Sequence, residues 1–162
     1  MAAPPPPEDS ASGAGPGPVR FERTFEVQPA DIDERGHVNN TVYVRWVQDV
    51  AASHWEAGAS RTQRAALAWV LLRHEIDYKH PALPGDQVLA RTWVGEASGA
   101  TFERHVELLR AADRRLLARS RTVWCPVDAQ SGRPRRVTAE VQACFSRPAP
   151  PASLDAARRR SD

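Results

Sequence analysis

The chain has 162 residues, with 22 basic and 20 acidic side chains and a formal net charge of +2. This length suffices for one domain of ordinary size, and the near-neutral charge argues against a general nucleic-acid-binding protein. No apolar run approaches the ~20 residues of a membrane-spanning helix, and Met1 to Asp9 lack the basic start and apolar core of a signal peptide. We therefore expect a cytoplasmic protein that binds neither nucleic acid nor a membrane.

The two ends of the chain differ in composition from its middle. Residues 1–19 are mostly Pro, Gly, Ala and Ser and predict a disordered leader, and the proline-rich and arginine-rich residues 147–162 predict a disordered tail. One folded domain is expected between them, over residues 20–146. The two cysteines, Cys125 and Cys144, lack metal-like or redox-like spacing, so we expect two buried thiols rather than a disulfide.

The first predicted elements are a strand and a long helix. Residues alternate in character from Phe21 to Val27, which predicts a strand. After a polar segment, a helix is expected from Thr41 to about Ala57, with Asn39 or Asn40 as its N-cap and Gly58 as its C-terminal stop. Apolar residues recur in this helix at intervals of three and four and form one buried stripe: Val42, Tyr43, Trp46, Val47, Val50, Ala51 and Trp55.

Four more strands are predicted, each bounded by turn-forming residues. Their ranges are 68–79, 88–95, 101–110 and 116–127, and Val137 to Phe145 predicts a short helix. Tight turns between neighbouring strands imply an antiparallel sheet, and one long helix lying across it gives an α+β domain. Such a sheet leaves an edge strand uncovered, so we expect a homo-oligomer formed by edge pairing.

The polar segment, Asp31 to Asn40, carries the candidate chemistry because it leads directly into the long helix. A helix start offers free backbone N–H groups and the positive end of a dipole. Asp33 and His37 add groups suited to proton transfer or nucleophilic attack. We interpret the protein as an enzyme on this segment.

The motif D-x-D-x-x-G-H-V-N-N-x-x-Y-x-x-W, followed by strands with Tyr78-Lys79-His80-Pro81 and Pro84-Gly85-Asp86, resembles the hotdog-fold acyl thioesterases. The most similar group is the 4-hydroxybenzoyl-CoA thioesterase-like family, and the plant acyl-ACP thioesterases are similar in this motif. The resemblance covers roughly residues 20 to 145 and implies the hotdog fold, an antiparallel five-stranded sheet wrapped around one long helix. It further implies a homodimer or homotetramer with the active site between subunits, and hydrolysis of an acyl-CoA or acyl-ACP thioester without metal or cofactor.

The resemblance assigns the catalytic roles. Asp33, the second acidic residue of the D-x-D pair, acts as nucleophile or as the base for water. His37 and Asn39 are candidates to orient water or to hydrogen-bond the carbonyl. The plant enzymes carry a catalytic Asn where this chain has Arg35, so their arrangement is not carried over whole.

Three further residues are candidates for binding the substrate. The resemblance places the oxyanion-binding backbone N–H at Asn40, at the start of the helix. Gly36 lets the backbone approach a ligand closely. Tyr43 is expected to line the acyl pocket or to hold Asp33 in place, with core packing as the more favoured role.

Structural alternatives exist for the polar residues. Asp31 and Asp33 can form Asx turns at a strand end; we expect this of Asp31 and expect catalysis of Asp33. The alternative for Asn39 and Asn40 is a role as helix caps alone. We expect this of the Asn40 side chain. For His37 both alternatives remain, a residue of the site or a hydrogen-bonding residue of the loop.

Other ligands leave weaker signals in the sequence. Phosphates of CoA would meet arginines at the pocket mouth, for which Arg61, Arg64, Arg91 and Arg104 are candidates by position. His74 and His80 have no acidic or cysteine partner at ligand spacing, so we predict no metal site.

Two other functions compete with a thioesterase. A non-catalytic hotdog protein would bind acyl thioesters without turnover, which the intact polar segment argues against. A hotdog dehydratase would act on hydroxyacyl thioesters, but such enzymes use a different arrangement of His and Asp.

Overall fold

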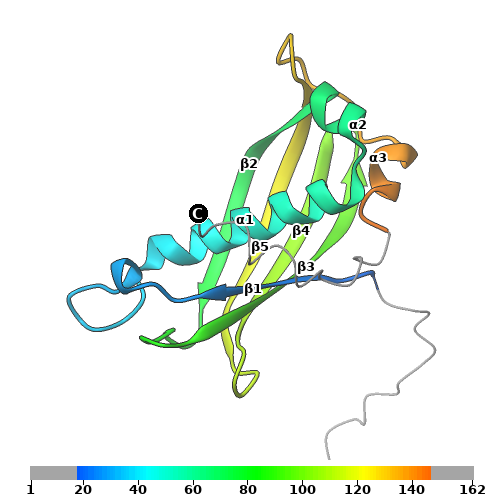
Figure 1. The fold of residues 1–162 in the computed structure, drawn as a ribbon. Coiled ribbons are helices and arrows are strands. Elements are labelled where there is room, and N and C mark those ends of the chain that lie inside the picture. Colours follow the sequence, from blue (N-terminus) through cyan, green and yellow to red (C-terminus); the bar gives the residue numbers. More distant parts are fainter. Residues whose placement is uncertain (1–17, 147–162) are drawn as a thin grey trace, which may run out of the picture.

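One long helix crosses a curved five-stranded sheet in the computed structural model, which describes residues 18–146 (Figure 1). The predicted tail and all but the last two residues of the predicted leader lie outside the described residues. The elements in chain order are β1 (Phe21–Glu26), a 3-10 turn η1 (Pro29–Asp31), α1 (Asn40–Gly58), α2 (Arg61–Ala66), β2 (Leu67–Tyr78), β3 (Gln87–Ser98), β4 (Thr101–Arg110), β5 (Leu116–Asp128) and α3 (Ala139–Ala143).

The sheet is antiparallel throughout, in the order β1-β3-β4-β5-β2. The strands β3, β4 and β5 are consecutive hairpin neighbours, whereas β1 and β2 form the two edges. This architecture confirms the predicted α+β class and the hotdog arrangement of a sheet around one helix. The predicted strands all exist, and the structure adds the short helix α2, which the sequence interpretation missed.

The apolar stripe of α1 packs on one face of the sheet. Trp46 and Val50 are 2% and 0% exposed, and they belong to the same core cluster as Val106 and Leu108 of β4. Because side chains alternate along a strand, every second residue of β4 faces this helix. Burying this stripe is what fixes the helix on the sheet.

The opposite face of the sheet carries charge instead of a second helix layer. Glu107 lies within ion-pair distance of Arg91 and Arg119, on the two neighbouring strands, and Glu103 pairs with Arg121. Exposed pairs of this kind add little stability each, but they keep this face polar. Within residues 18–146, no helix combines the length and apolar character needed to cross a membrane.

The helix α1 ends at Gly58, as the sequence predicts, but for a different physical reason. Gly58 is the last helical residue and is not a left-handed C-terminal stop: the chain leaves through Ala59, whose φ is −91°. An ideal Cβ on Gly58 would lie 1.6 Å from the carbonyl oxygen of Cys144. Glycine is required here because the chain around α3 packs directly on the helix backbone. Cys125 and Cys144 are both buried thiols, as predicted.

We predict that Gly58→Ala destabilises the protein, although alanine favours a helix by about 1 kcal/mol over glycine. The added methyl group collides with the Cys144 backbone, and overpacking of this kind typically costs about 1–3 kcal/mol. Chemical unfolding of both proteins measures the difference. The control is Gly95→Ala, whose Cβ would meet only side-chain atoms at 3.1 Å or more, and equal stability of the two variants would contradict the packing explanation.

Candidate active site

The polar segment forms a small closed loop before α1, at the end of the helix opposite α2 and α3 (Figure 1). A single β-bridge pairs Ile32 with Val38. Inside it, the backbone N–H of Asp33 donates to the oxygen of His37 at 2.7 Å, and Gly36 donates to the oxygen of Asp33 at 3.0 Å. Gly36 has a φ of +75°, a conformation that favours glycine. The turn therefore needs this glycine for its shape.

Asp31 holds this loop against the helix. Its carboxylate is 4% exposed, accepts the backbone N–H of Gln28 at 2.9 Å and accepts Arg45 of α1 at 2.8 Å. The Asp31 carbonyl oxygen accepts the N–H of Asn39 at 2.8 Å. These bonds give Asp31 the structural role expected for it, and they fix the loop relative to the first turns of α1.

Asp33 presents an ionised carboxylate near the helix start. Its Oδ1 accepts backbone N–H groups from Arg35 at 2.9 Å and from His37 at 3.2 Å. The hydrogen bond from His37, with that from Arg35 and the nearby positive charges, lowers the pKa of Asp33 below its ordinary value of 3.8. Oδ2 accepts no hydrogen bond from residues 18–146. Asp33 thus makes an Asx-type turn and keeps one oxygen available.

The first turn of α1 has one unused backbone donor. The side chain of Asn39 caps the helix by accepting the N–H of Thr41 at 3.0 Å, which confirms one of the two predicted caps. The oxygen of Asn39 accepts the N–H of Val42 at 2.9 Å. The N–H of Asn40 precedes any intrahelical acceptor and donates to no acceptor among the described residues. This N–H has the free valence that an oxyanion site requires.

The remaining predicted site residues divide into exposed and buried. The imidazole of His37 is exposed, so its role as a site residue stays a prediction. Tyr43 is 3% exposed; its hydroxyl oxygen accepts the backbone N–H of Ala82 at 2.7 Å, and burial raises its pKa. Because Ala82 also accepts the N–H of Val38 at 3.1 Å, Tyr43 braces the loop from inside the core. This matches the packing role. The Tyr43 ring makes no hydrogen bond with Asp33 and does not line the cavity at the other end of α1.

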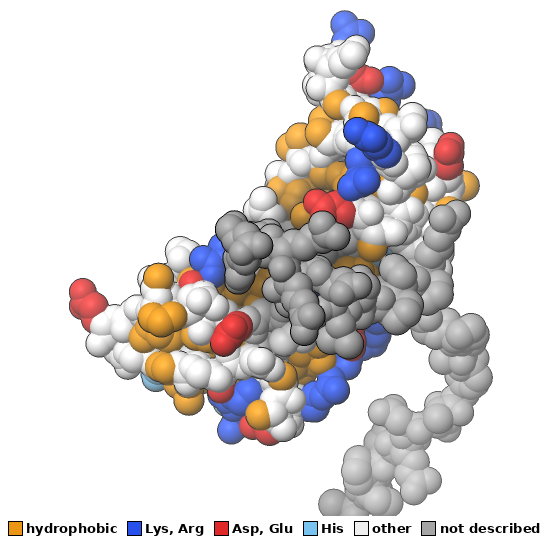
Figure 2. All heavy atoms as spheres, viewed as in Figure 1, with side chains coloured by type: hydrophobic (Ala, Val, Ile, Leu, Met, Phe, Trp, Pro, Cys, Tyr) orange, Lys and Arg blue, Asp and Glu red, His pale blue; other side chains and the backbone are white. Residues whose placement is uncertain are grey.

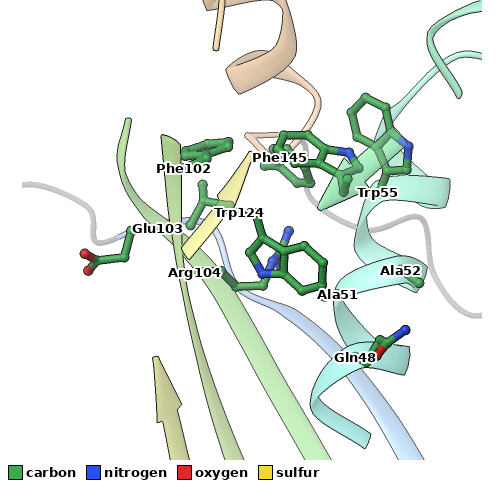
Figure 3. Close-up of a pocket in the computed structure, with 11 residues that line it drawn as sticks. Gln48, Ala51, Ala52, Trp55, Phe102, Glu103, Arg104, Trp124 and Phe145 are labelled. Atoms are coloured by element: carbon green, nitrogen blue, oxygen red, sulfur yellow. The ribbon is translucent and has the colours of Figure 1, made fainter. Parts of the chain in front are cut away.

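A cavity of about 210 Å³ lies at the other end of α1, between the helix and the sheet (Figure 3). We call it the aromatic pocket because aromatic rings from four elements and the residue Phe145 surround it. Its lining residues are Gln48, Ala51, Ala52, Trp55, Trp69, Val94, Phe102, Glu103, Arg104, Trp124 and Phe145.

The aromatic pocket and the loop are well separated within one chain. Gln48 and Trp55 follow Asn40 by 8 and 15 residues on the same helix. At 1.5 Å of rise per residue, the pocket lies roughly 12–22 Å from the helix start. Within one chain, the polar segment and the cavity therefore do not meet.

The arginines proposed for phosphate binding fall in three places. Arg91 lies on the charged face of the sheet, paired with Glu22 and Glu107, and Arg104 is 5% exposed inside the aromatic pocket. Neither stands at an exposed pocket mouth, so the structure corrects both assignments. Arg61 and Arg64 lie exposed on α2 and stay candidates.

The sequence interpretation missed the aromatic pocket itself. One signal was present: Arg104 occupies a position of β4 where the alternating partners Phe102, Val106 and Leu108 are all apolar. A charge in an inward-facing register is unusual. No group of three or more His, Cys, Asp or Glu side chains in residues 18–146 could hold a metal ion.

Comparison with known proteins places this geometry in context. The sequence profile described as the Thioesterase-like superfamily matches residues 27–145. No curated protein matches the sequence.

Solved structures match the whole described fold. Slr0204, a 1,4-dihydroxy-2-naphthoyl-CoA thioesterase from Synechocystis, is 22% identical, covering 78% of this chain and 95% of its own, with a TM-score of 0.68. YbaW, a probable thioesterase from Escherichia coli, is 15% identical over 78% and 98%, with a TM-score of 0.69. The hypothetical protein SAV2348 from Staphylococcus aureus, in complex with CoA, is 14% identical over 87% and 92%, with a TM-score of 0.70. At these identities the likeness shows a common fold.

We predict that Asp33→Asn loses stability in a pH-dependent way. The folded-state pKa of Asp33 lies below 3.8, so its carboxylate contributes stability above that pH and loses the contribution as pH falls through the folded pKa. The free energy of unfolding should differ between variant and wild type at neutral pH, and the difference should vanish in acid. Denaturant titrations across pH measure it. Glu34→Gln is the control, because the Glu34 carboxylate accepts no hydrogen bond in this loop, and a pH-independent difference for Asp33→Asn would contradict the argument.

Proposed function

The chain belongs to the thioesterase-like superfamily, and from that membership we propose that it is an acyl-CoA thioesterase, hydrolysing a thioester to a free acid and a thiol. The observation that carries this proposal is the pairing of an ionised Asp33 with the unused N–H of Asn40 on one closed loop. A carboxylate supplies the attacking group and a helix start supplies the oxyanion donor. An acyl-ACP is the alternative substrate, since the same two groups would serve either carrier.

In the proposed mechanism, the carbonyl oxygen of the thioester accepts the N–H of Asn40, at the positive end of the α1 dipole. Negative charge develops on that oxygen, and one preorganised donor is typically worth about 3 kcal/mol of barrier. Asp33 then attacks the carbonyl carbon or removes a proton from an attacking water. A general base works best with a pKa near the working pH, so the lowered pKa of Asp33 favours direct attack.

Direct attack gives a balanced sequence of two steps. An Asp33 oxygen forms a bond to the acyl carbon, the carbon–sulfur bond breaks, and the thiolate leaves and takes up a proton. Water then hydrolyses the resulting anhydride, releasing the acid and restoring the carboxylate. His37 and Asn39, beside this point, are the proposed groups for orienting that water.

The separation of loop and pocket within one chain supports a homodimer. At the edge of the sheet, β2 exposes a run of apolar residues: Val70, Leu71 and Leu72, at 45%, 40% and 56%. Figure 2 shows hydrophobic atoms reaching the surface on this side of the molecule. An uncovered apolar edge strand is a template for pairing with another strand. We propose that two copies pair through β2 about a two-fold axis.

This pairing would complete the site. The end of β2 is tied to the loop, because the hydroxyl of Tyr78 donates to the oxygen of Asn40 at 3.2 Å. The start of β2 carries Trp69 into the aromatic pocket. Antiparallel pairing places the end of one β2 beside the start of the other, and so brings the partner subunit's Asn40 toward this pocket. The acyl group would then occupy the pocket of one subunit while its carbonyl meets the loop of the other.

We predict that Asp33→Asn lowers kcat for thioester hydrolysis by at least about 10²-fold, because the amide can neither attack the acyl carbon nor take a proton from water. Free-thiol release from short, long and aromatic acyl-CoAs measures the rate. Glu34→Gln, the neighbouring carboxylate, should keep wild-type activity. Equal rates for Asp33→Asn and wild type would remove Asp33 from the chemistry, and binding of acyl-CoA without turnover by the wild type would favour the non-catalytic alternative.

Mixed dimers test whether the two halves of a site come from different chains. Asp33→Asn disables the loop, and Ala51→Phe, at a buried residue of the cavity wall, fills the aromatic pocket. Co-expression of the two inactive variants should restore about a quarter of wild-type activity, since half of randomly paired dimers are mixed and each holds one intact site. Inactive mixed dimers of folded subunits would place the loop and pocket of each site in the same chain.

Two matched arginine substitutions test the proposed dimer interface along β2. Leu72→Arg should give an inactive but folded monomer by light scattering after gel filtration, because it puts a charge in the centre of the proposed interface. Leu83→Arg, at a residue 38% exposed outside β2, should stay dimeric and active.

A further inference from the structure

The aromatic pocket contains a buried positive charge. Arg104 of β4 extends toward α1 across the cavity (Figure 3). One terminal nitrogen of its guanidinium donates to Thr92 at 2.9 Å and lies 3.1 Å from Nδ1 of His54. Burial lowers the pKa of Arg104 to about 9, which still leaves the group charged at neutral pH.

No negative group balances this charge in the described part of the chain. None of the ion pairs among residues 18–146 includes Arg104. Burial and the neighbouring Arg104 lower the pKa of His54 to about 3, so His54 is neutral and accepts through Nδ1. Glu103 is adjacent in sequence but points away from the cavity (Figure 3), where it pairs with Arg121 and His105. The guanidinium therefore sits between two neutral acceptors and the π-face of Phe145, 5.0 Å from the ring centroid.

A buried charge without a counter-charge is costly, and apolar residues often replace such groups at no loss of stability. The two hydrogen bonds and the Phe145 ring offset only part of the cost of burying this charge. The remaining N–H groups of Arg104 donate to no acceptor in the described chain and face the cavity. An arginine fork matches the geometry of a carboxylate, which can accept two parallel hydrogen bonds.

A second unpaired donor belongs to a residue of the cavity wall. Nε1 of Trp69 is buried and has no hydrogen-bond partner within the described residues, although a buried indole N–H usually has one. Trp69 lines the cavity from β2, while Arg104 enters from β4. The unpaired N–H groups of Arg104 on this cavity indicate a ligand with acceptor atoms.

The size of the cavity limits that ligand. A volume of about 210 Å³ accommodates a short chain or a single ring. The walls Trp55, Phe102 and Trp124 offer apolar contact to the body of such a group.

We propose that the aromatic pocket selects a compact acyl group carrying a second carboxylate, which Arg104 binds at the far end from the thioester. This inference rests on the proposed function, because it takes the pocket as the acyl site. Arg104 is then a specificity-determining residue and takes no part in bond breaking.

The test compares substrates that differ only in the distal carboxylate. Glutaryl-CoA is paired with pentanoyl-CoA, and 4-carboxybenzoyl-CoA with benzoyl-CoA. Wild-type kcat/KM should favour the carboxylated member of at least one pair by tenfold or more. Arg104→Met should reverse or abolish this preference while leaving the neutral member within about threefold, since methionine fills the space of the arginine stem without its charge.

Two further variants separate recognition from a structural effect. Arg104→Lys keeps the charge but loses the fork, so it should retain part of the preference. Glu107→Gln also removes one charge from β4, on the charged face of the sheet and outside the pocket lining, and should leave the preference unchanged. Thermal unfolding of Arg104→Met checks that the variant is folded at the assay temperature, which separates loss of selectivity from loss of fold.

The outcomes distinguish this inference from the proposed function. Hydrolysis of neutral acyl-CoAs with no Arg104-dependent preference would overturn the inference and keep the thioesterase. If no acyl-CoA is hydrolysed, glutarate and terephthalate binding by calorimetry still tests the pocket. Binding lost in Arg104→Met would then support the inference, and equal or absent binding in both proteins would overturn it.

Discussion

Burial of α1 against one face of a single sheet is the constraint on which the rest of this structure depends. The helix has 19 residues, which makes it about 28 Å long at 1.5 Å per residue. Trp46 and Val50 fix its middle on the sheet. Its two ends are therefore held far apart, one beside the polar segment and the other beside α2 and α3 (Figure 1). The polar segment and the aromatic pocket therefore lie near opposite ends of α1.

The two ends of α1 differ in whether their buried charged groups have a partner of opposite charge. At the start of α1, the buried carboxylate of Asp31 is paired with Arg45 and hydrogen-bonded to the backbone. That pairing holds the loop rigid and leaves Asp33 as the accessible anion. At the other end, Arg104 is buried without a negative partner among the described residues. The loop thus has a paired structural carboxylate and an accessible one, whereas the pocket has a cation without a negative partner among the described residues.

The sequence predicts elements well where the signal is local. The three-and-four spacing of apolar residues located α1, and the Asn39 cap follows from side-chain chemistry within one turn. The sequence places the end of α1 correctly at Gly58 but for the wrong reason, because the requirement for glycine comes from the backbone of Cys144, far along the chain. The aromatic pocket is not predicted for the same reason. Its lining comes from α1, from the four strands β2 to β5 and from Phe145, near the C-terminal end of the described chain. Only the charge at Arg104, in an apolar register, marked it locally.

The placement of charges also limits how an anionic acyl group can bind. Asp33 would repel a second carboxylate brought close to it, and this repulsion strengthens wherever water is excluded. Arg104 attracts the same carboxylate at the end of the cavity away from the loop that we propose a partner subunit supplies. Attraction at one end and repulsion at the other favour a single orientation, with the thioester carbonyl at the helix start. Selectivity would then arise from the positions of two charges that never contact each other, which explains why a fold of this size retains an arginine in its interior.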